Sequence, residues 1–204
     1  MTLNSFFIVL DGVDGSGTTT HSKLLVSFLE YQGFKVHLTR EPSKSEIGIL
    51  LRKFLKNKEI PPTTDALLFA ADRDLHYHNE IKKKLDEDYI VISDRYIESS
   101  IIYQSLQADS ITIEWIKNLN KFVGLPDLTI ILDIDPKIAL ARKTDEDLEK
   151  FEDTTFLDKV RDLYLSRAKQ EGYYIINSNE IIEFVQEKIQ NIVLEKLRLN
   201  NLKK

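Results

Sequence analysis

A glycine-rich stretch between a short apolar run and a helical pattern has the composition of a phosphate-binding loop. The pattern G-x-x-x-x-G-K-[ST] is met at Gly12, Gly17 and Thr19, although its lysine is absent. Glycines suit such a loop because backbone N–H groups must point inward around a phosphate, where Cβ atoms would obstruct them. The following helix N-terminus adds aligned amide donors, and the Thr19 hydroxyl is spaced to bind a Mg²⁺ that bridges nucleotide phosphates. The predicted ATP-binding loop, residues 12–19, consists of Gly12, Val13, Asp14, Gly15, Ser16, Gly17, Thr18 and Thr19.

Thr18 occupies the position at which this pattern has its lysine. That cation normally contacts the β- and γ-phosphates and stabilises charge during phosphoryl transfer. A charge-assisted hydrogen bond contributes roughly 1.5–3 kcal/mol, so we expect its loss to slow transfer on the order of ten- to a hundredfold. Nucleotide binding is expected to persist through the amides and Mg²⁺, and the alternative is a glycine-rich turn that binds no ligand.

Two acid–base pairs follow later apolar runs. Arg40 and Glu41 come directly after the second run, and Asp94 and Arg95 come after the third. Because the carboxyl ends of parallel strands meet at one edge of a sheet, we expect both pairs to lie at the edge that carries the glycine-rich loop.

An aromatic ring and a guanidinium share one face of a long helical pattern. Phe69 and Arg73 are spaced i, i+4, and such a pair suits a flat base that forms hydrogen bonds. Taken alone, Phe69 is equally consistent with core packing, and Arg73 with the surface. A shorter helical pattern further on carries Ser99, Ser100, Tyr103 and Gln104.

Short apolar runs alternate with longer helical patterns, which indicates one α/β domain over residues 1–204 with a parallel sheet. Several runs are apolar without alternation, as is typical of strands covered on both faces. The expected strands are Phe6–Leu10, Phe34–Thr39, Tyr89–Ser93, Leu128–Asp133 and Tyr173–Ile176. The expected helices are Thr18–Tyr31, Glu46–Lys56, Thr64–Leu85, Ser99–Leu106, Ile111–Phe122, Pro136–Lys143, Asp153–Gln170 and Glu180–Leu199.

The composition excludes several classes of function. The 204 residues contain no cysteine, which rules out disulfide frameworks, zinc ribbons, iron–sulfur sites and thiol nucleophiles. A net charge of −5 argues against a nucleic-acid partner. No run approaches the ~18 apolar residues of a membrane span, and the apolar run at residues 6–10 is too short for a signal peptide. We therefore expect a cytoplasmic location and no membrane association.

A nearly uniformly charged segment, Lys143–Lys150, separates two helical patterns. It is consistent with a solvated loop, and its place after the Pro136 helix also fits a lid over an active site, with residues 142–152 as its extent.

Several motifs, in this order along nearly the whole chain, resemble those of the thymidylate kinase family. The Asp-Arg-Tyr motif with its trailing Ser-Ser and Tyr-Gln is the most family-specific of them. They are Gly12-Val13-Asp14-Gly15-Ser16-Gly17, Thr39-Arg40-Glu41-Pro42, Leu67-Leu68-Phe69-Ala70-Ala71-Asp72-Arg73, Asp94-Arg95-Tyr96-Ile97-Glu98-Ser99-Ser100-Ile101-Ile102-Tyr103-Gln104, Leu132-Asp133-Ile134-Asp135-Pro136 and Lys150-Phe151-Glu152.

This resemblance implies a three-layer P-loop fold with a five-stranded parallel sheet, a homodimer, and transfer of the γ-phosphoryl of ATP to thymidine monophosphate. By analogy Phe69 stacks on thymine, Arg73 and Ser100 form hydrogen bonds to the edge of the base, and Tyr103 lies against the deoxyribose. The substrate-binding residues that the resemblance implies are Asp14, Arg40, Glu41, Phe69, Arg73, Arg95, Ser99, Ser100, Tyr103 and Gln104.

The resemblance also implies roles around the phosphates. Asp14 holds the 3′-hydroxyl or helps to order Mg²⁺ near the acceptor phosphate, and Arg95 grips phosphate. Asp94 orders the metal shell or the loop, so that Thr19 and Asp94 are the expected metal residues. No general base is required, because an acceptor phosphate is already anionic and catalysis rests on alignment and charge neutralisation.

The chain departs from the family at Thr18, and Gly15 and Ser16 leave the loop without the arginine that some members have there. Our hypothesis is that lid closure brings Arg142, together with Lys143, onto the β/γ-phosphates in place of the lysine. Arg142 thereby joins the ATP-binding residues, and the expected catalytic residues are Asp14, Asp94, Arg95 and Arg142.

Two other functions remain open. In a deoxynucleoside kinase the acceptor is a neutral hydroxyl, and Glu41 stands where the base would be needed. A non-catalytic nucleotide-binding protein is the second alternative, and Thr18 is its only support.

Overall fold

The computed structural model describes residues 5–57, 59–142 and 154–202. In that part of the chain the strands are β1 (Phe6–Gly12), β2 (Val36–Arg40), β3 (Ile90–Asp94), β4 (Leu128–Asp133) and β5 (Tyr174–Asn177). The helices are α1 (Thr18–Tyr31), α2 (Glu46–Phe54), α3 (Pro62–His76), the π-helix η1 (Tyr77–Ile81), α4 (Lys82–Asp86), α5 (Ile97–Ser105), α6 (Ile113–Leu119), α7 (Pro136–Ala141), α8 (Thr154–Glu171) and α9 (Ile182–Leu202).

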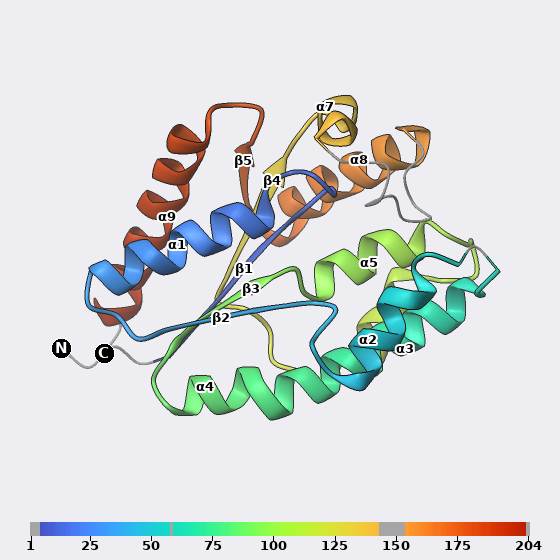
Figure 1. Cartoon of the computed structure of the whole chain (residues 1–204), viewed down its shortest axis with the longest axis horizontal. Helices are drawn as coiled ribbons and strands as arrows, with labels where there is room; N and C mark the ends of the chain where they lie inside the picture. Colours follow the sequence, from blue (N-terminus) through green and yellow to red (C-terminus); the bar gives the residue numbers. More distant parts are fainter. Residues whose placement is uncertain (1–4, 58, 143–153, 203–204) are drawn as a thin grey trace.

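The strands form one parallel sheet in the order β2-β3-β1-β4-β5, with helices on both faces (Figure 1). This confirms the predicted α/β fold with a five-stranded parallel sheet. Strand β2 begins two residues later than expected, at Val36, because the preceding Gly33 has a φ of 85° in the turn after α1. Glycine adopts that left-handed conformation without strain.

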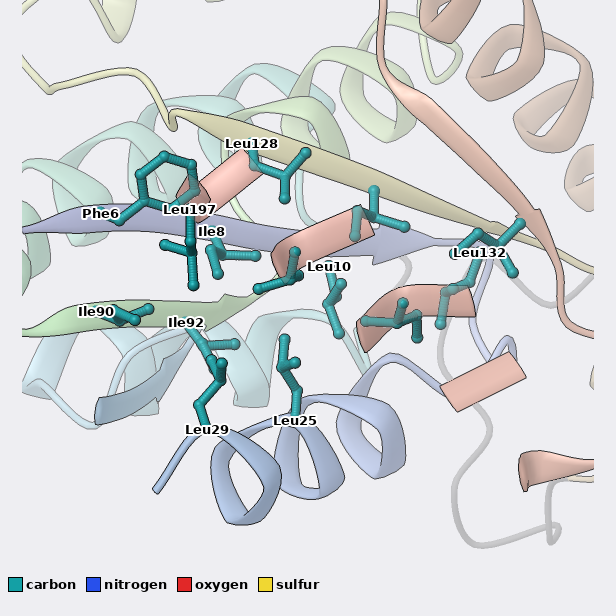
Figure 2. Close-up of a cluster of buried hydrophobic side chains, with 14 of the residues drawn as sticks. Phe6, Ile8, Leu10, Leu25, Leu29, Ile90, Ile92, Leu128, Leu132 and Leu197 are labelled. Atoms are coloured by element: carbon teal, nitrogen blue, oxygen red, sulfur yellow. The ribbon is translucent and has the colours of Figure 1, made fainter. Parts of the chain in front are cut away.

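One face of the sheet packs against α1 and α9. Side chains at alternate positions of β1 point to this face, where Ile8 and Leu10 meet Leu25 and Leu29 of α1 (Figure 2). Alternation follows from the period of two in a strand. Leu24, which the helical pattern includes in the apolar stripe of α1, is 39% exposed and lies outside this core.

The other face of the sheet packs against α5 and α8. Val9 of β1 belongs to the cluster with Ile97 and Ile101 of α5, and Ile131 of β4 to the cluster with Val160 of α8. Thus β1 is buried on both faces, and the loop that follows it starts from the central strand of the sheet.

The long helix predicted over Thr64–Leu85 is divided in the structure. It begins earlier, with Pro62 at its first position, where proline's missing N–H leaves no donor unsatisfied. After His76 the chain forms the π-helical turn η1 before continuing as α4. Helix α3 nevertheless keeps Phe69 and Arg73 on one straight segment.

Helix α7 lies against the glycine-rich loop. Asp135 caps it by accepting a hydrogen bond from the Lys137 N–H at 2.8 Å, and Pro136 takes its first position, as predicted. The helix ends before Arg142, and of the proposed lid (residues 142–152) all but Arg142 lie outside the described residues.

None of the helices in the described part of the chain combines the length and apolar character needed to cross a membrane.

Candidate active site

The glycine-rich loop is closely packed against its neighbours. A Cβ atom on Gly12 would lie 2.5 Å from the Leu132 carbonyl oxygen of β4, and one on Gly15 would lie 2.6 Å from the Ala139 carbonyl oxygen of α7. Both distances are shorter than any tolerable contact, so larger residues at either position would displace the loop. The glycines therefore allow the loop to sit close to the sheet and to α7.

A pocket of about 500 Å³ opens above the N-terminus of α1, and we call it the donor pocket. Residues 14–19 of the predicted loop line it, and the hydroxyl of Ser16 is buried there without a partner among the described residues. Of the predicted loop residues, Gly12 and Val13 do not line it. Val13 belongs to the core beneath, with an exposed fraction of 1%.

Arg142, which directly follows α7, lines this pocket. Its guanidinium donates to the Gly15 carbonyl at 3.2 Å and to the Ser178 carbonyl at 3.3 Å. Besides Arg142, the described cations that line the donor pocket include Arg95. Positive charge thus reaches the loop from outside it, although Thr18 itself is uncharged. Lys143, the partner expected for Arg142, lies outside the described residues.

Thr19 and Asp94 meet beside the donor pocket. The Thr19 hydroxyl donates to Asp94 Oδ2 at 2.5 Å, while Asp94 Oδ1 is buried and has no partner among the described residues. Hydroxyl and carboxylate oxygens are ligands that Mg²⁺ prefers, and Mg²⁺ typically takes few protein ligands beside substrate phosphates. The pair therefore fits a magnesium ion. The described residues contain no group of three or more histidines and carboxylates that would form another metal site.

A second pocket, of about 120 Å³, lies between α3 and α5, and we call it the acceptor pocket. Nearly all residues expected to bind the acceptor line it. They are Asp14, Glu41, Phe69, Arg73, Arg95, Ser99, Ser100, Tyr103 and Gln104. Arg40 is the exception: it is exposed at the end of β2 and lines a different cavity. The expectation that Arg40 contacts the acceptor has no support in this placement, because successive side chains of a strand point to opposite faces.

Arg73 is buried at the base of the acceptor pocket, with an exposed fraction of 1%. Its guanidinium donates to Glu41 at 2.7 Å, to Asn120 at 2.8 Å and to the Ser100 hydroxyl at 2.9 Å. A buried charge requires such partners, and they fix the guanidinium plane. Glu41 also accepts a hydrogen bond from His76 at 3.2 Å, so both of its oxygens are engaged.

Gln104 places a hydrogen-bond acceptor in the acceptor pocket. Its side-chain oxygen is buried and makes no hydrogen bond to the described residues, although the residue is only 1% exposed. A buried polar atom of this kind costs free energy unless a ligand or water satisfies it. Because Gln104 lines the acceptor pocket beside Phe69, the pocket offers a flat ring and a free hydrogen-bond acceptor.

The donor and acceptor pockets share Asp14 and Arg95. Arg95 has a φ of 72°, an uncommon conformation for a residue with a side chain. It donates to the Gly12 carbonyl at 3.0 Å, to Ser99 at 2.9 Å and to the Asp14 carboxylate. Although burial opposes its charge, Asp14 raises the pKa of Arg95 above its ordinary value, so the guanidinium stays charged between the two pockets.

Asp11, which was not among the residues expected at the site, organises this region from below. The residue is fully buried at the end of β1, and its carboxylate accepts hydrogen bonds from the Ser99 hydroxyl at 2.6 Å and the Tyr164 hydroxyl at 2.7 Å. Burial raises the pKa of Asp11. In the sequence, the only indication of a role for Asp11 was that a carboxylate follows an otherwise apolar strand.

The family model for thymidylate kinase matches residues 10–189. The chain belongs to the thymidylate kinase family. The match spans the glycine-rich loop, both pockets and the first turns of α9. Thymidylate kinases are nucleoside monophosphate kinases.

Curated relatives within this family resemble the chain over nearly its whole length. A probable thymidylate kinase of Pyrobaculum aerophilum is 47% identical over 92% of this chain and 97% of its own. Those of Methanothermobacter thermautotrophicus and Pyrococcus abyssi are 40% and 39% identical, over 92% and 96% of this chain and 93% and 98% of their own.

Proposed function

We propose that the chain transfers the γ-phosphoryl group of ATP to thymidine monophosphate, giving thymidine diphosphate. The observation that carries this proposal is that the donor and acceptor pockets share Asp14 and Arg95. A kinase needs its two anionic substrates to meet, and a charged arginine at the junction offsets the repulsion between them.

In this reaction the protein's residues align the substrates and neutralise charge. The loop amides and the α1 N-terminus bind the donor phosphates, and Arg95 holds the acceptor phosphate in line with them. The hydrogen bond with Arg95 fixes the Asp14 carboxylate. Asp14 then accepts a hydrogen bond from the 3′-hydroxyl of the acceptor or helps to order Mg²⁺ near the acceptor phosphate. The acceptor oxygen is already anionic, so no side chain has to remove a proton.

Recognition of thymine rests on Phe69, Arg73 and Gln104. The Phe69 ring stacks on the base, and the fixed guanidinium of Arg73 faces its edge with Ser100. The free oxygen of Gln104 accepts a hydrogen bond from the ring N–H of thymine. Tyr103, whose pKa is raised by burial so that its hydroxyl stays protonated, lies against the sugar and disfavours a 2′-hydroxyl.

Mg²⁺ is the proposed metal, held by Thr19 and Asp94. A magnesium ion bound by these two residues would offset the negative charge of the donor phosphates. Arg142 supplies the cation that Thr18 cannot, and its contact with the Gly15 carbonyl supports this assignment. Residues 142–152 are proposed to form the lid that brings Arg142 fully over the phosphates.

The alternative of a deoxynucleoside kinase is less well supported. Glu41 would have to act as its base, yet the carboxylate is buried and is engaged by both Arg73 and His76. The alternative of a non-catalytic nucleotide-binding protein gives no reason for an acceptor pocket that shares residues with the donor pocket.

We further propose a single-domain enzyme that works as a homodimer in the cytoplasm. The homodimer is supported by exposed apolar side chains on two adjoining helices, Ile49 and Leu50 of α2 and Leu67 of α3, which a second copy would cover.

The proposed activity is tested by ADP release with ATP, Mg²⁺ and a panel of acceptors. We expect thymidine monophosphate to be consumed, and thymidine and the ribose-containing uridine monophosphate to react at least about a hundredfold more slowly. Faster turnover of thymidine would favour the deoxynucleoside kinase. Background ADP release with every acceptor, despite ATP binding, would favour the non-catalytic protein.

A further inference from the structure

A third cavity, of about 160 Å³, lies beside the candidate magnesium residues, and we call it the flanking cavity. It is bounded by the first turns of α1 and by the carboxyl ends of β2 and β3. The residues that matter for its chemistry are Thr19, Lys23, Arg40, Lys44, Glu80 and Asp94. It shares Thr19 with the donor pocket and none of its lining residues with the acceptor pocket.

Lys23, Arg40 and Lys44 bring three positive charges to this cavity from separate segments of the chain. Within the described residues, none of the three makes an ion pair or a side-chain hydrogen bond. This is notable in a chain of net charge −5, where acidic partners are abundant. Three like charges left without a partner on one cavity repel each other, and an anion between them would relieve that repulsion.

A buried hydroxyl of the lining is consistent with the same class of ligand. Ser22 is fully buried, and its hydroxyl has no partner among the described residues. Of the two carboxylates in the lining, Glu80 accepts from His37, whose hydrogen bond lowers the pKa of Glu80 to about 2. Asp94 accepts from Thr19 through Oδ2, and its Oδ1, which has no partner among the described residues, is the oxygen offered to the proposed magnesium ion. An anion would therefore bind on the side of the cavity that carries the three cations.

The lining excludes a nucleoside. Among the described residues around the flanking cavity there is no aromatic side chain, and the apolar contribution is Leu38. A nucleobase would lack both a stacking partner and an apolar contact face. Hydroxyls and cations without an aromatic platform suit a small tetrahedral oxyanion.

We propose that the flanking cavity is a binding site for a small phosphate oxyanion, distinct from the donor and acceptor pockets. Lys23, Arg40 and Lys44 bind the anion's oxygens, and the Ser22 hydroxyl donates a further hydrogen bond. The site does not depend on the proposed kinase reaction. The flanking cavity and the donor pocket share Thr19, so that an anion in the flanking cavity adjoins the phosphates of a nucleotide bound in the donor pocket.

Calorimetric titration of the full chain with inorganic phosphate, and separately with pyrophosphate, tests this site. The protein is first saturated with Mg²⁺, a non-hydrolysable ATP analogue and thymidine monophosphate, so that both other pockets are filled. That preliminary step itself reports whether the proposed substrates bind, independently of the new site. We expect one further equivalent of phosphate or pyrophosphate to bind.

Charge-removing variants identify the site. Lys23→Gln and Lys44→Gln are each expected to weaken this binding about tenfold, because each removes one charge-assisted contact from an exposed side chain. Lys169→Gln, an exposed lysine on α8, is the matched control and should leave affinity unchanged. Thermal melting of each variant verifies that it folds. Absence of a further equivalent, or equal affinity in all three variants, would overturn the proposal.

Discussion

At the scale of single residues, the question this chain raises is how a phosphate loop works with threonine in place of lysine. The loop provides amides and hydroxyls, but its position 18 carries no charge. The guanidinium of Arg142 already lies against the Gly15 carbonyl, which is 127 residues away in the sequence but adjacent in space. A cation supplied from the residue that follows α7 would be the functional equivalent of the missing lysine once it contacts the bound phosphates.

Removing that guanidinium should therefore slow the chemical step. In Arg142→Ala we expect kcat to fall about ten- to a hundredfold, the effect of one charge-assisted hydrogen bond, and Thr18→Lys to recover part of the loss. Steady-state kinetics with ATP and thymidine monophosphate measure both. Arg198→Ala on α9 removes an arginine that is likewise exposed and serves as the control. Unchanged turnover in Arg142→Ala would show that another group carries this charge.

The role of Phe69 is testable in the same assay. Stacking of an aromatic ring on a base contributes roughly 1–3 kcal/mol, so Phe69→Ala should raise the KM for thymidine monophosphate by about ten- to a hundredfold. The KM for ATP should change little, because Phe69 lines only the acceptor pocket. Phe122→Ala, at a ring that is 69% exposed, is the matched control. Equal increases in both KM values would contradict a role for Phe69 in recognising the base.

At the scale of elements, the position of the loop depends on how α1 packs on the sheet. Leu25 is fully buried between α1 and the sheet (Figure 2), whereas the exposed fraction of its neighbour Leu24 is 39%. Leu25→Ala is expected to lower the free energy of unfolding by about 2–5 kcal/mol, and Leu24→Ala by less than about 1 kcal/mol. Chemical denaturation of the two variants measures the difference. Similar losses in both would mean that α1 is rotated relative to the arrangement described here.

A buried histidine joins the first turn of α1 to α9. His21 Nδ1 donates to the Gln186 side-chain oxygen at 2.9 Å, and burial lowers the pKa of His21 below 6.5. The neutral imidazole is therefore the form that the fold favours. Because the pKa is lower in the folded than in the unfolded chain, this contribution to stability is present above pH 6.5 and is lost as the pH falls through the folded pKa.

Between pH 8 and pH 5, the free energy of unfolding should thus fall more in the wild type than in His21→Asn, which has no group to protonate there. Denaturant titrations at several pH values compare the two proteins. Parallel pH profiles would indicate that His21 titrates alike in the folded and unfolded chains.

At the scale of the whole molecule, the strand–helix alternation and the glycine-rich loop were sufficient to predict the parallel sheet and the edge that carries the site. Short local signals determined these features: continuous apolar runs, a proline at the start of α7, and glycines before α1. The acceptor pocket also formed largely from predicted residues, because Phe69 and Arg73 share one helix face.

What the sequence could not predict depends on contacts between distant segments. The partners of Arg73, among them Asn120, come from elements far along the chain, and so do those of Asp11. Likewise Arg40 was expected with the acceptor residues because of its motif, whereas in the structure it lies at the end of the edge strand β2 and lines the flanking cavity. The spacing of residues along the sequence identifies candidate residue types. Which distant residues contact one another is visible only in the tertiary structure.

The central claim is that one junction, built by Asp14 and Arg95, brings the two substrates' phosphates together. The most direct test is titration with a bisubstrate ligand in which adenosine and thymidine are joined through five phosphates. It should bind with one-to-one stoichiometry, displace both ATP and thymidine monophosphate, and exceed either in affinity by about a hundredfold or more, because linked groups bind as one. If it displaced only one of the two substrates, or bound no more tightly than ATP, the pockets would not meet and the account would be wrong.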